Sequence, residues 1–173
     1  KRLPVDLGQG WYRHTTKAKL LAYSLVGPGT GQALDLGCGD GFWTQKLQER
    51  GWIVTSTNYR DDRYPGALDV NAELPLPFRD AQFDLVWAIE VIEHVKNVTR
   101  FVSEIRRILR PGGRLILTTP NSAFWLYTVL SVFGITARRI QNPDHKQFFS
   151  LGDIRALFPE ARILGFFPYA VLK

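Results

Sequence analysis

Methionine is absent from the 173-residue sequence, and Cys38 is its single cysteine. One cysteine excludes a disulfide within the chain and is typical of a reducing compartment, so we expect a cytoplasmic protein. Internal repeats, low-complexity tracts and long polar linkers are also absent, and the apolar segment 122–133 is too short to span a bilayer. These absences favour a single domain over residues 1–173.

Positive charge is concentrated in the C-terminal part of the sequence. Residues 1–99 contain 11 Lys and Arg and 12 Asp and Glu, whereas residues 100–173 contain 11 and 4, a net charge of +7. Such a basic region fits an anionic partner, either a membrane surface or a polyanion such as RNA. It fits equally well a solvated basic surface without a partner, and both interpretations stay open.

Apolar segments with strand and helix patterns alternate along the chain, which is typical of a parallel sheet covered by helices on both faces. The run FDLVWAI at 83–89 is apolar almost throughout, as expected for a central strand buried on both faces. We predict helices near 13–26, 42–50, 98–109 and 151–158, and strands near 33–36, 52–57, 83–89, 114–119 and 162–167. The predicted fold class is α/β, with a mostly parallel sheet whose last strand is missing or incomplete.

A glycine-rich loop, LDLGCGDG at 34–41, follows the first predicted strand. Glycines let the backbone turn sharply and approach a ligand, and the N-terminus of the next helix then faces that ligand. The alternating spacing of Gly37, Gly39 and Gly41 differs from the G-x-G-x-x-G spacing of dinucleotide-binding loops. Asp35 lies within the motif, where a carboxylate suits a cationic ligand better than a pyrophosphate.

Several ordered motifs give the sequence a resemblance to class I S-adenosylmethionine-dependent methyltransferases. They are the loop DLGCGDG, LPF at 76–78, FDLVWAIEVIEHV at 83–95, LRPGG at 109–113, and the segment ending TTPN at Asn121. The resemblance implies a three-layer Rossmann-like fold, S-adenosylmethionine as cofactor and methyl transfer as activity. For the loop alone, the alternative is a nucleotide-binding fold without methyl transfer.

The same resemblance implies which residues bind the cofactor. Asp35, Gly37 and Gly39 would hold its amino-acid end, while Asp69 would lie near the adenine and Glu90 would border the site. The full predicted set is Asp35, Leu36, Gly37, Cys38, Gly39, Asn58, Asp69, Val70 and Glu90. Most of these residues lie near the carboxyl ends of predicted strands, where open α/β sheets bind their ligands.

Position 58 departs from the family pattern. Members usually carry an acidic residue at the end of the second strand, where it binds both ribose hydroxyls, whereas this sequence has Asn58. An amide still hydrogen-bonds a hydroxyl, but without the assistance of a charge. Asp61 or Asp62 could substitute if the loop folds back. The segment 59–67 is too short and too rich in Pro and Gly for the helix that is usual there.

Acidic and histidine residues follow the fourth predicted strand. Glu90, Glu93 and His94 occupy positions i, i+3 and i+4, so a helix that begins there would place them on one face. Together with His145 they form a partial ligand set for a divalent cation such as Mg²⁺, Mn²⁺ or Zn²⁺. Alternatively, Glu93 and His94 begin a helix without binding a metal, and His145 packs or acts alone as a base.

The ExxEH pattern at 90–94 resembles ubiquinone-biosynthesis O-methyltransferases, and the later DHK at 144–146 resembles small-RNA 3′-terminal 2′-O-methyltransferases. In the latter family, two glutamates and two histidines bind a metal that holds the hydroxyls. A cation bound to a hydroxyl oxygen lowers its pKa and creates a nucleophile, which favours oxygen as the methyl acceptor. We therefore predict that His145, His94 and Glu93 take the proton or bind the metal.

An apolar segment followed by arginines, near 122–142, forms a predicted insertion after the strand that ends at TTPN. One interpretation is an interfacial helix over 122–139 that contacts the membrane periphery and recruits a hydrophobic substrate. The other is a helix that packs on the sheet or caps the acceptor pocket. Both interpretations place the segment near the acceptor.

The predicted reaction is O-methylation of a small-molecule hydroxyl, on a quinol or catechol, a sugar or a lipid-linked acceptor. Three alternatives remain open: RNA 2′-O-methylation, metal-independent methylation of nitrogen or carbon, and a non-catalytic cofactor-binding module. The basic C-terminal part favours the first of these. Asn58 and the incomplete sheet favour the last.

Overall fold

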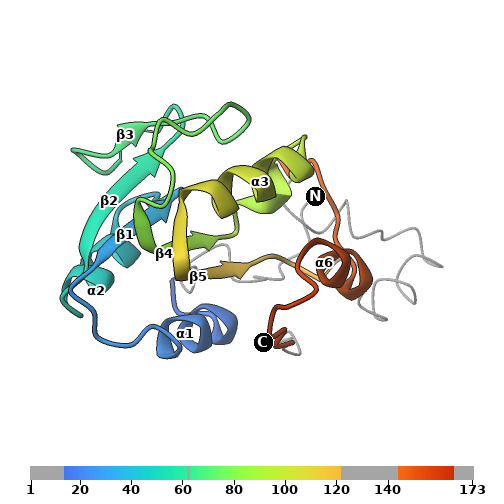
Figure 1. Cartoon of the computed structure of the whole chain (residues 1–173), viewed down its shortest axis with the longest axis horizontal. Helices are drawn as coiled ribbons and strands as arrows, with labels where there is room; N and C mark the ends of the chain where they lie inside the picture. The colour runs from blue at the N-terminus through green and yellow to red at the C-terminus, as the bar shows by residue number, and fades with distance from the viewer. Residues whose placement is uncertain (1–13, 62, 122–143, 166–173) are drawn as a thin grey trace, which may run out of the picture.

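The computed structural model describes residues 14–61, 63–121 and 144–165, in which helices and strands alternate (Figure 1). The helices are α1 (Lys17–Ser24), α2 (Phe42–Gln48), α3 (Val98–Ile108) and α6 (Leu151–Leu157), with the short 3-10 helix η1 (Ile92–His94). The strands are β1 (Gln32–Leu36), β2 (Ile53–Asn58), β3 (Leu68–Asp69), β4 (Phe83–Ile89) and β5 (Leu109–Thr118). The predicted α/β fold is therefore confirmed.

The five strands form one sheet in the order β3-β2-β1-β4-β5, and every recorded pair is parallel. The chain moves outward from β1 to β3 and then returns to place β4 on the other side of β1. In open α/β sheets a ligand crevice lies where the strand order reverses, beyond the carboxyl ends of the strands. Here that point lies between β1 and β4.

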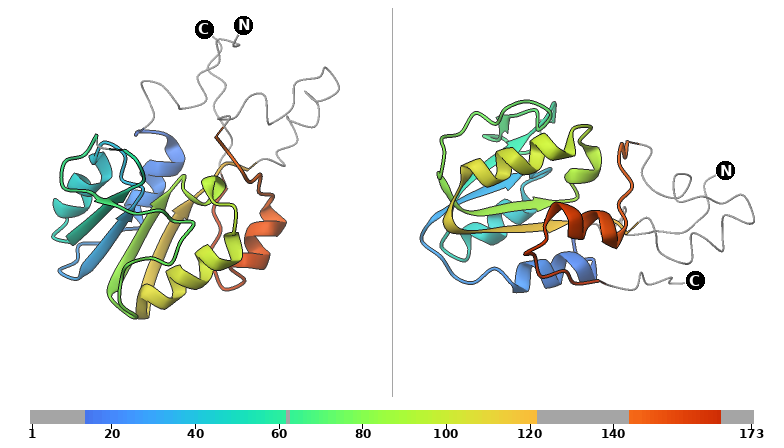
Figure 2. Two further views of the ribbon diagram at one scale, coloured as in Figure 1. Left: turned by 90° about the horizontal axis from the view of Figure 1, so that it is seen from above. Right: turned by 45° about the vertical axis from the view of Figure 1, so that its right-hand side comes forward.

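Helices cover both faces of the sheet, so the fold has three layers (Figure 2). Successive residues of a strand point to opposite faces. In β4, Leu85 and Trp87 pack in a core with side chains of α1 and α2, whereas Val86 and Ala88 pack in a second core with α3. The apolar character of the whole strand follows from this double burial.

Local signals explain where the helices on the second face begin. The Asn97 side chain accepts a hydrogen bond from the N–H of Arg100 at the start of α3. Ser150 and Asp153 form a reciprocal capping box at the start of α6. The buried face of α3 consists of Phe101, Val102, Ile105 and Ile108, the helical pattern read from the sequence.

Two predicted elements are wrong. Residues 162–165 form no strand, and none of the described strands pairs with them. The expected helix with Glu90, Glu93 and His94 on one face does not form, because Glu90 has a left-handed backbone (φ 57°) and is followed only by the single turn η1. By contrast, the segment 59–67 lacks a helix in its described residues, as expected.

The predicted insertion near 122–142, including the proposed membrane contact at 122–139, lies outside the described residues. Within the ranges that the structure describes, no helix combines the length and the apolar character needed to cross a membrane.

Candidate cofactor and acceptor site

The glycine loop connects β1 to α2 at the point where the strand order reverses. Gly37, Gly39 and Gly41 have positive φ angles of 77°, 59° and 80°, a conformation that favours glycine. A Cβ on Gly37 would also lie 2.9 Å from Cγ2 of Val91, and one on Gly41 would collide with the ring of Tyr64. The loop shape therefore requires glycine at these positions.

Asn58 holds the glycine loop from the end of β2. The N–H of Gly39 donates to Asn58 Oδ1 at 2.7 Å, and Asn58 Nδ2 donates to the carbonyl of Gly39 at 2.8 Å. Because Asn58 is only 5% exposed, this amide is largely committed to the loop backbone. The ribose contact predicted for Asn58 stays a prediction, and the structure gives the residue a second role that sequence reasoning missed.

Asp35 lies beneath the loop and is 2% exposed. Its Oδ2 accepts a hydrogen bond of 2.6 Å from the hydroxyl of Thr44 in α2, and this hydroxyl is 2.9 Å from that of Ser56. Burial raises the pKa of Asp35 to about 7, although the bond from Thr44 opposes the rise. The carboxyl group thus joins β1, α2 and β2 behind the loop.

This burial predicts a pH dependence of stability. Below pH about 4, Asp35 is protonated in both the folded and the unfolded protein. Between pH about 4 and 7, Asp35 loses its proton only in the unfolded chain, and this loss favours unfolding. We expect Asp35 to lower the free energy of unfolding by up to about 4 kcal/mol over that interval, and Asp35→Asn to abolish this contribution. Urea denaturation of both proteins near pH 4.5 and 7.5 measures the difference. Identical pH dependence in the two proteins would contradict the assignment.

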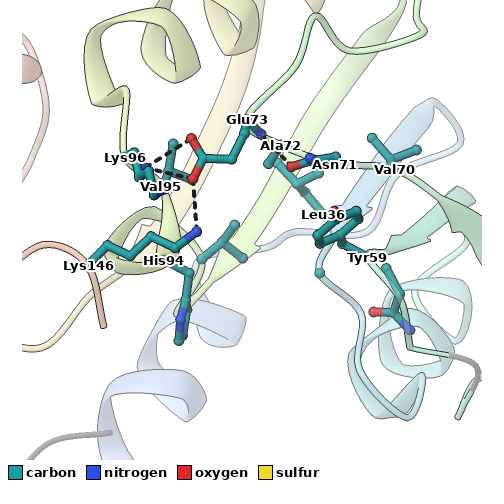
Figure 3. A pocket seen from close by; sticks show the side chains of 13 residues that line it. Leu36, Tyr59, Val70, Asn71, Ala72, Glu73, His94, Val95, Lys96 and Lys146 are labelled. Carbon is teal, nitrogen blue, oxygen red and sulfur yellow. Dashed lines mark hydrogen bonds and ion pairs between the residues drawn. The ribbon is translucent and has the colours of Figure 1, made fainter. Parts of the chain in front are cut away.

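A cleft of about 480 Å³ opens beside the loop (Figure 3). Four predicted cofactor residues line it: Leu36, Gly37, Asn58 and Val70. Tyr59, Asn71, Ala72 and Val91 also line it, and sequence reasoning did not single them out. Largely apolar walls with a few amide groups suit a ligand that is part nucleoside and part aliphatic chain.

The other predicted cofactor residues do not line the cleft. Asp69 is exposed, and its Oδ1 accepts a hydrogen bond of 3.0 Å from the N–H of Arg60. Cys38 is buried, and burial raises the pKa of its thiol to about 12, so the thiol stays neutral. Asp35 and Gly39 support the loop, as described above. Contacts between these residues and a cofactor stay predictions.

Glu73 also lines the cleft. Its Oε1 accepts a hydrogen bond of 2.9 Å from Nζ of Lys146, and the N–H of Lys96 lies 3.0 and 3.1 Å from its two carboxylate oxygens (Figure 3). The backbone N–H groups of Lys146 and Gln147 both donate to the carbonyl of Glu93, at 2.8 and 3.0 Å. These bonds join the segment before α6 to η1.

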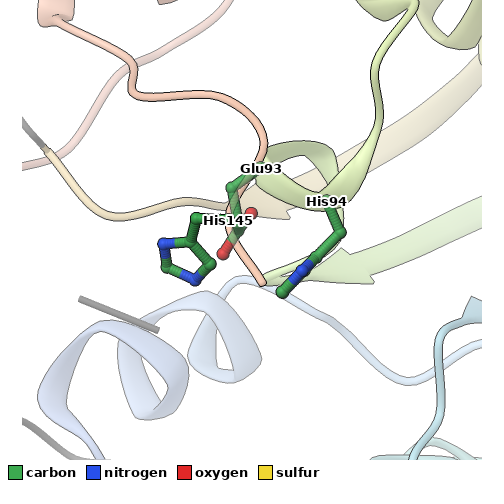
Figure 4. A group of neighbouring side chains, drawn as sticks. All are labelled: Glu93, His94 and His145. Carbon is green, nitrogen blue, oxygen red and sulfur yellow. The ribbon is translucent and has the colours of Figure 1, made fainter. Parts of the chain in front are cut away.

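The joined segments bring Glu93, His94 and His145 together (Figure 4). One potential ligand atom from each residue lies within 4.8 Å of the other two. We call these three residues the acid–histidine cluster. The sequence prediction that residues 51 positions apart meet at one site is therefore supported by the geometry, for three of the four predicted metal ligands.

The fourth predicted ligand, Glu90, is not part of the acid–histidine cluster. Its Oε2 lies 2.7 Å from Nζ of Lys19 in α1, and its side chain is 45% exposed. The left-handed backbone at Glu90 turns this side chain away from the helical face that the sequence predicted. In this structure Glu90 therefore pairs with Lys19, and its assignment as a metal ligand stays a prediction.

Glu93 is the unusual member of the cluster. It is 1% exposed, and neither carboxylate oxygen has a hydrogen-bond partner among the described residues. Burial raises the pKa of Glu93 to about 8 and the charge of Glu90 adds to the rise, whereas the Thr119 hydroxyl, although outside hydrogen-bond geometry, lies close enough to oppose the rise in part. A buried carboxyl group without a partner is costly, so such a group indicates a missing ligand, ion or water.

The surroundings of the two imidazoles indicate how each is protonated. His94 Nδ1 lies 3.1 Å from the carbonyl oxygen of Asp144, which can only accept, so Nδ1 carries a proton and Nε2 is left for a ligand. Burial, together with the charge of His94, lowers the pKa of His145. His145 is therefore a neutral imidazole at physiological pH, able to accept a proton or bind a cation.

Comparison with known proteins identifies the class. Residues 34–117 match the family model of the methyltransferase domain. A solved SAM-dependent methyltransferase from Archaeoglobus fulgidus has the same fold, with a TM-score of 0.62 and 16% identity over 85% of this chain and 69% of that chain. The matched region is a little under half of the chain, and over it the chain is similar to S-adenosylmethionine-dependent methyltransferases, whose class I fold it shares.

Two relatives show how far the likeness extends. A protein of Mycolicibacterium smegmatis named as a probable S-adenosylmethionine-dependent methyltransferase is 36% identical over 123 residues, 64% of this chain. The ubiquinone biosynthesis O-methyltransferase of Coxiella burnetii is 28% identical over 172 residues, 83% of this chain and 72% of that protein. The chain spans about half the length of the mycobacterial relative (46%).

Proposed function

We propose that this protein transfers the methyl group of S-adenosylmethionine to a hydroxyl oxygen of a small-molecule acceptor. The observation that carries the proposal is the buried carboxyl group of Glu93, which lacks a hydrogen-bond partner among the described residues and lies beside two imidazoles. The match to the methyltransferase domain supports the cofactor, and the likeness to an O-methyltransferase supports oxygen as the acceptor.

The cleft residues would bind and orient the cofactor. Gly37, Asn58 and His94 all line the cleft, so the cleft connects the glycine loop with the acid–histidine cluster. S-adenosylmethionine supplies a methyl group already activated by its sulfonium, so the protein contributes chiefly by aligning the acceptor oxygen. As the new O–C bond forms and the S–C bond breaks, His145 takes the proton of the acceptor hydroxyl when no cation is bound, whereas the proton passes to solvent when His145 holds the cation proposed below.

We further propose that the acid–histidine cluster binds a divalent cation during the reaction. One carboxylate and two imidazoles are a ligand set that suits Zn²⁺ or Mn²⁺ better than Mg²⁺. Ligand atoms about 2 Å from a tetrahedral cation would be about 3.5 Å apart, so the three groups, which lie within 4.8 Å of one another, would have to move together by roughly 1 Å to hold it. A bound cation would provide Glu93 with the partner it lacks and would lower the pKa of the acceptor hydroxyl.

Transfer of labelled methyl tests the proposed reaction. We expect label from S-adenosylmethionine to appear on the oxygen of a catechol, quinol, sugar or lipid-linked hydroxyl, and to decrease when a chelator removes the cation. Label on nitrogen or carbon would contradict the acceptor class, and label on RNA would replace the small molecule with a 2′-hydroxyl. Full activity in the presence of chelator would contradict the proposed cation but not the proposed methyl transfer.

A further inference from the structure

Lys19 of α1 is a buried cation next to the candidate active site. The residue is 7% exposed, and its Nζ lies 2.7 Å from Oε2 of Glu90. Its charge also reaches Glu93, where it opposes part of the rise in pKa that burial causes. An ammonium is rarely buried unless a carboxylate compensates its charge, and here the carboxylate of Glu90, directly after β4, does so.

The position of Lys19 is imposed by the docking of α1. Tyr23, one turn further along the helix, packs its ring 5.3 Å from that of Trp43 and donates its hydroxyl to the carbonyl of Lys46 at 2.8 Å. The guanidinium of Arg50 lies over the Tyr23 ring, with its Cζ 3.6 Å from the ring centroid, and it donates a hydrogen bond of 2.6 Å to the Tyr23 carbonyl. The helix therefore brings the Lys19 ammonium to the site in a fixed register.

Glu90 is the side chain on which Lys19 acts. It belongs to the same five-residue run as Glu93 and His94, yet its carboxylate is outside the acid–histidine cluster and bound to Lys19. Its backbone is held at the end of β4 by a hydrogen bond of 3.0 Å to the carbonyl of Thr118. The charge of Glu90 acts on both Glu93 and His145, so its side chain lies near the cluster and, with the backbone fixed, its rotation changes which of the two neighbours it faces.

We propose that Lys19 is a positioning residue that keeps the Glu90 carboxylate out of the acid–histidine cluster. The cluster then offers a cation three protein ligands, and the remaining coordination positions stay available to the acceptor hydroxyl. Without Lys19, Glu90 joins as a fourth protein ligand and the cation binds more tightly. This inference rests on the cation-assisted reaction proposed above, and it adds the residue that limits how tightly the cation is held.

Titration calorimetry with Mn²⁺ alone tests the inference on the whole chain. We expect Lys19→Met to bind Mn²⁺ about 10- to 100-fold more tightly than the wild type. Lys19→Arg, which keeps the charge, should bind like the wild type. The double variant Lys19→Met/Glu90→Gln should lose the increase in Mn²⁺ affinity. Glu90→Gln alone should change the Mn²⁺ affinity by less than about threefold. Lys19→Gln repeats the test if Lys19→Met does not fold.

Each other outcome overturns the inference. A gain that persists in the double variant would show that Lys19 acts only through its charge and does not position Glu90. Equal Mn²⁺ affinity with and without Lys19, or no binding by any variant, would show that Lys19 does not control a cation site. Binding of S-adenosylmethionine, measured on the same samples, separates this failure from that of the proposed function, because it does not depend on Mn²⁺.

Discussion

Glu93→Gln is expected to lower the rate of methyl transfer by about 100- to 1,000-fold, because it removes the carboxylate that completes the acid–histidine cluster. The same change should leave the free energy of unfolding equal or higher, since an amide of the same shape replaces a buried carboxyl group without a partner among the described residues. Residues kept for function often lower stability in this way. Single-turnover kinetics and urea denaturation measure the two quantities.

Glu160→Gln is a matched control, because it makes the same chemical change on a side chain that is 71% exposed. We expect it to keep wild-type activity and stability. Binding of S-adenosylmethionine should be unchanged in Glu93→Gln, since Glu93 does not line the cleft. If Glu93→Gln transferred methyl at the wild-type rate, neither a base nor a cation-binding role for Glu93 would stand.

Asn58→Asp is expected to weaken S-adenosylmethionine binding by about 5- to 100-fold, although it moves the sequence toward the usual family pattern. The aspartate keeps the acceptor for the N–H of Gly39, but it places an oxygen where Nδ2 now donates to the Gly39 carbonyl. Loss of this buried bond and the repulsion between two oxygens should cost about 1–3 kcal/mol of loop stability. Titration calorimetry measures the affinity.

Asn58→Ala separates the two possible roles of the position. It removes both bonds to Gly39 without adding repulsion, so its affinity should lie between those of the wild type and Asn58→Asp. If Asn58→Asp instead bound the cofactor more tightly than the wild type, residue 58 would contact the ribose as the family's acid does, and the loop contact would be secondary.

Much of the fold follows from local patterns. The apolar run 83–89 forms β4 with the predicted bounds, and the helical spacing at 98–109 forms α3. These elements depend on burial periodicity, which is visible in a single sequence. The predicted strand at 162–167 fails in its described residues because a strand needs a neighbouring strand, and composition alone cannot supply one.

The site is less predictable, because its decisive contacts join distant residues. The pattern ExxEH correctly brings Glu93 and His94 to His145, but it assumes a helix, and the left-handed backbone at Glu90 prevents one. Lys19 lies 71 residues before Glu90, and nothing near either residue signals their ion pair. Where side chains point depends on tertiary packing, which the local sequence does not encode.

Titration of the chain with S-adenosylmethionine tests the central claim most directly, namely that the cleft beside the glycine loop is a cofactor site. We expect saturable binding of one molecule per chain, weakened in Asn58→Asp, and no binding of NAD under the same conditions. Absence of S-adenosylmethionine binding by the folded wild-type chain, with its secondary structure verified by circular dichroism, would contradict the account.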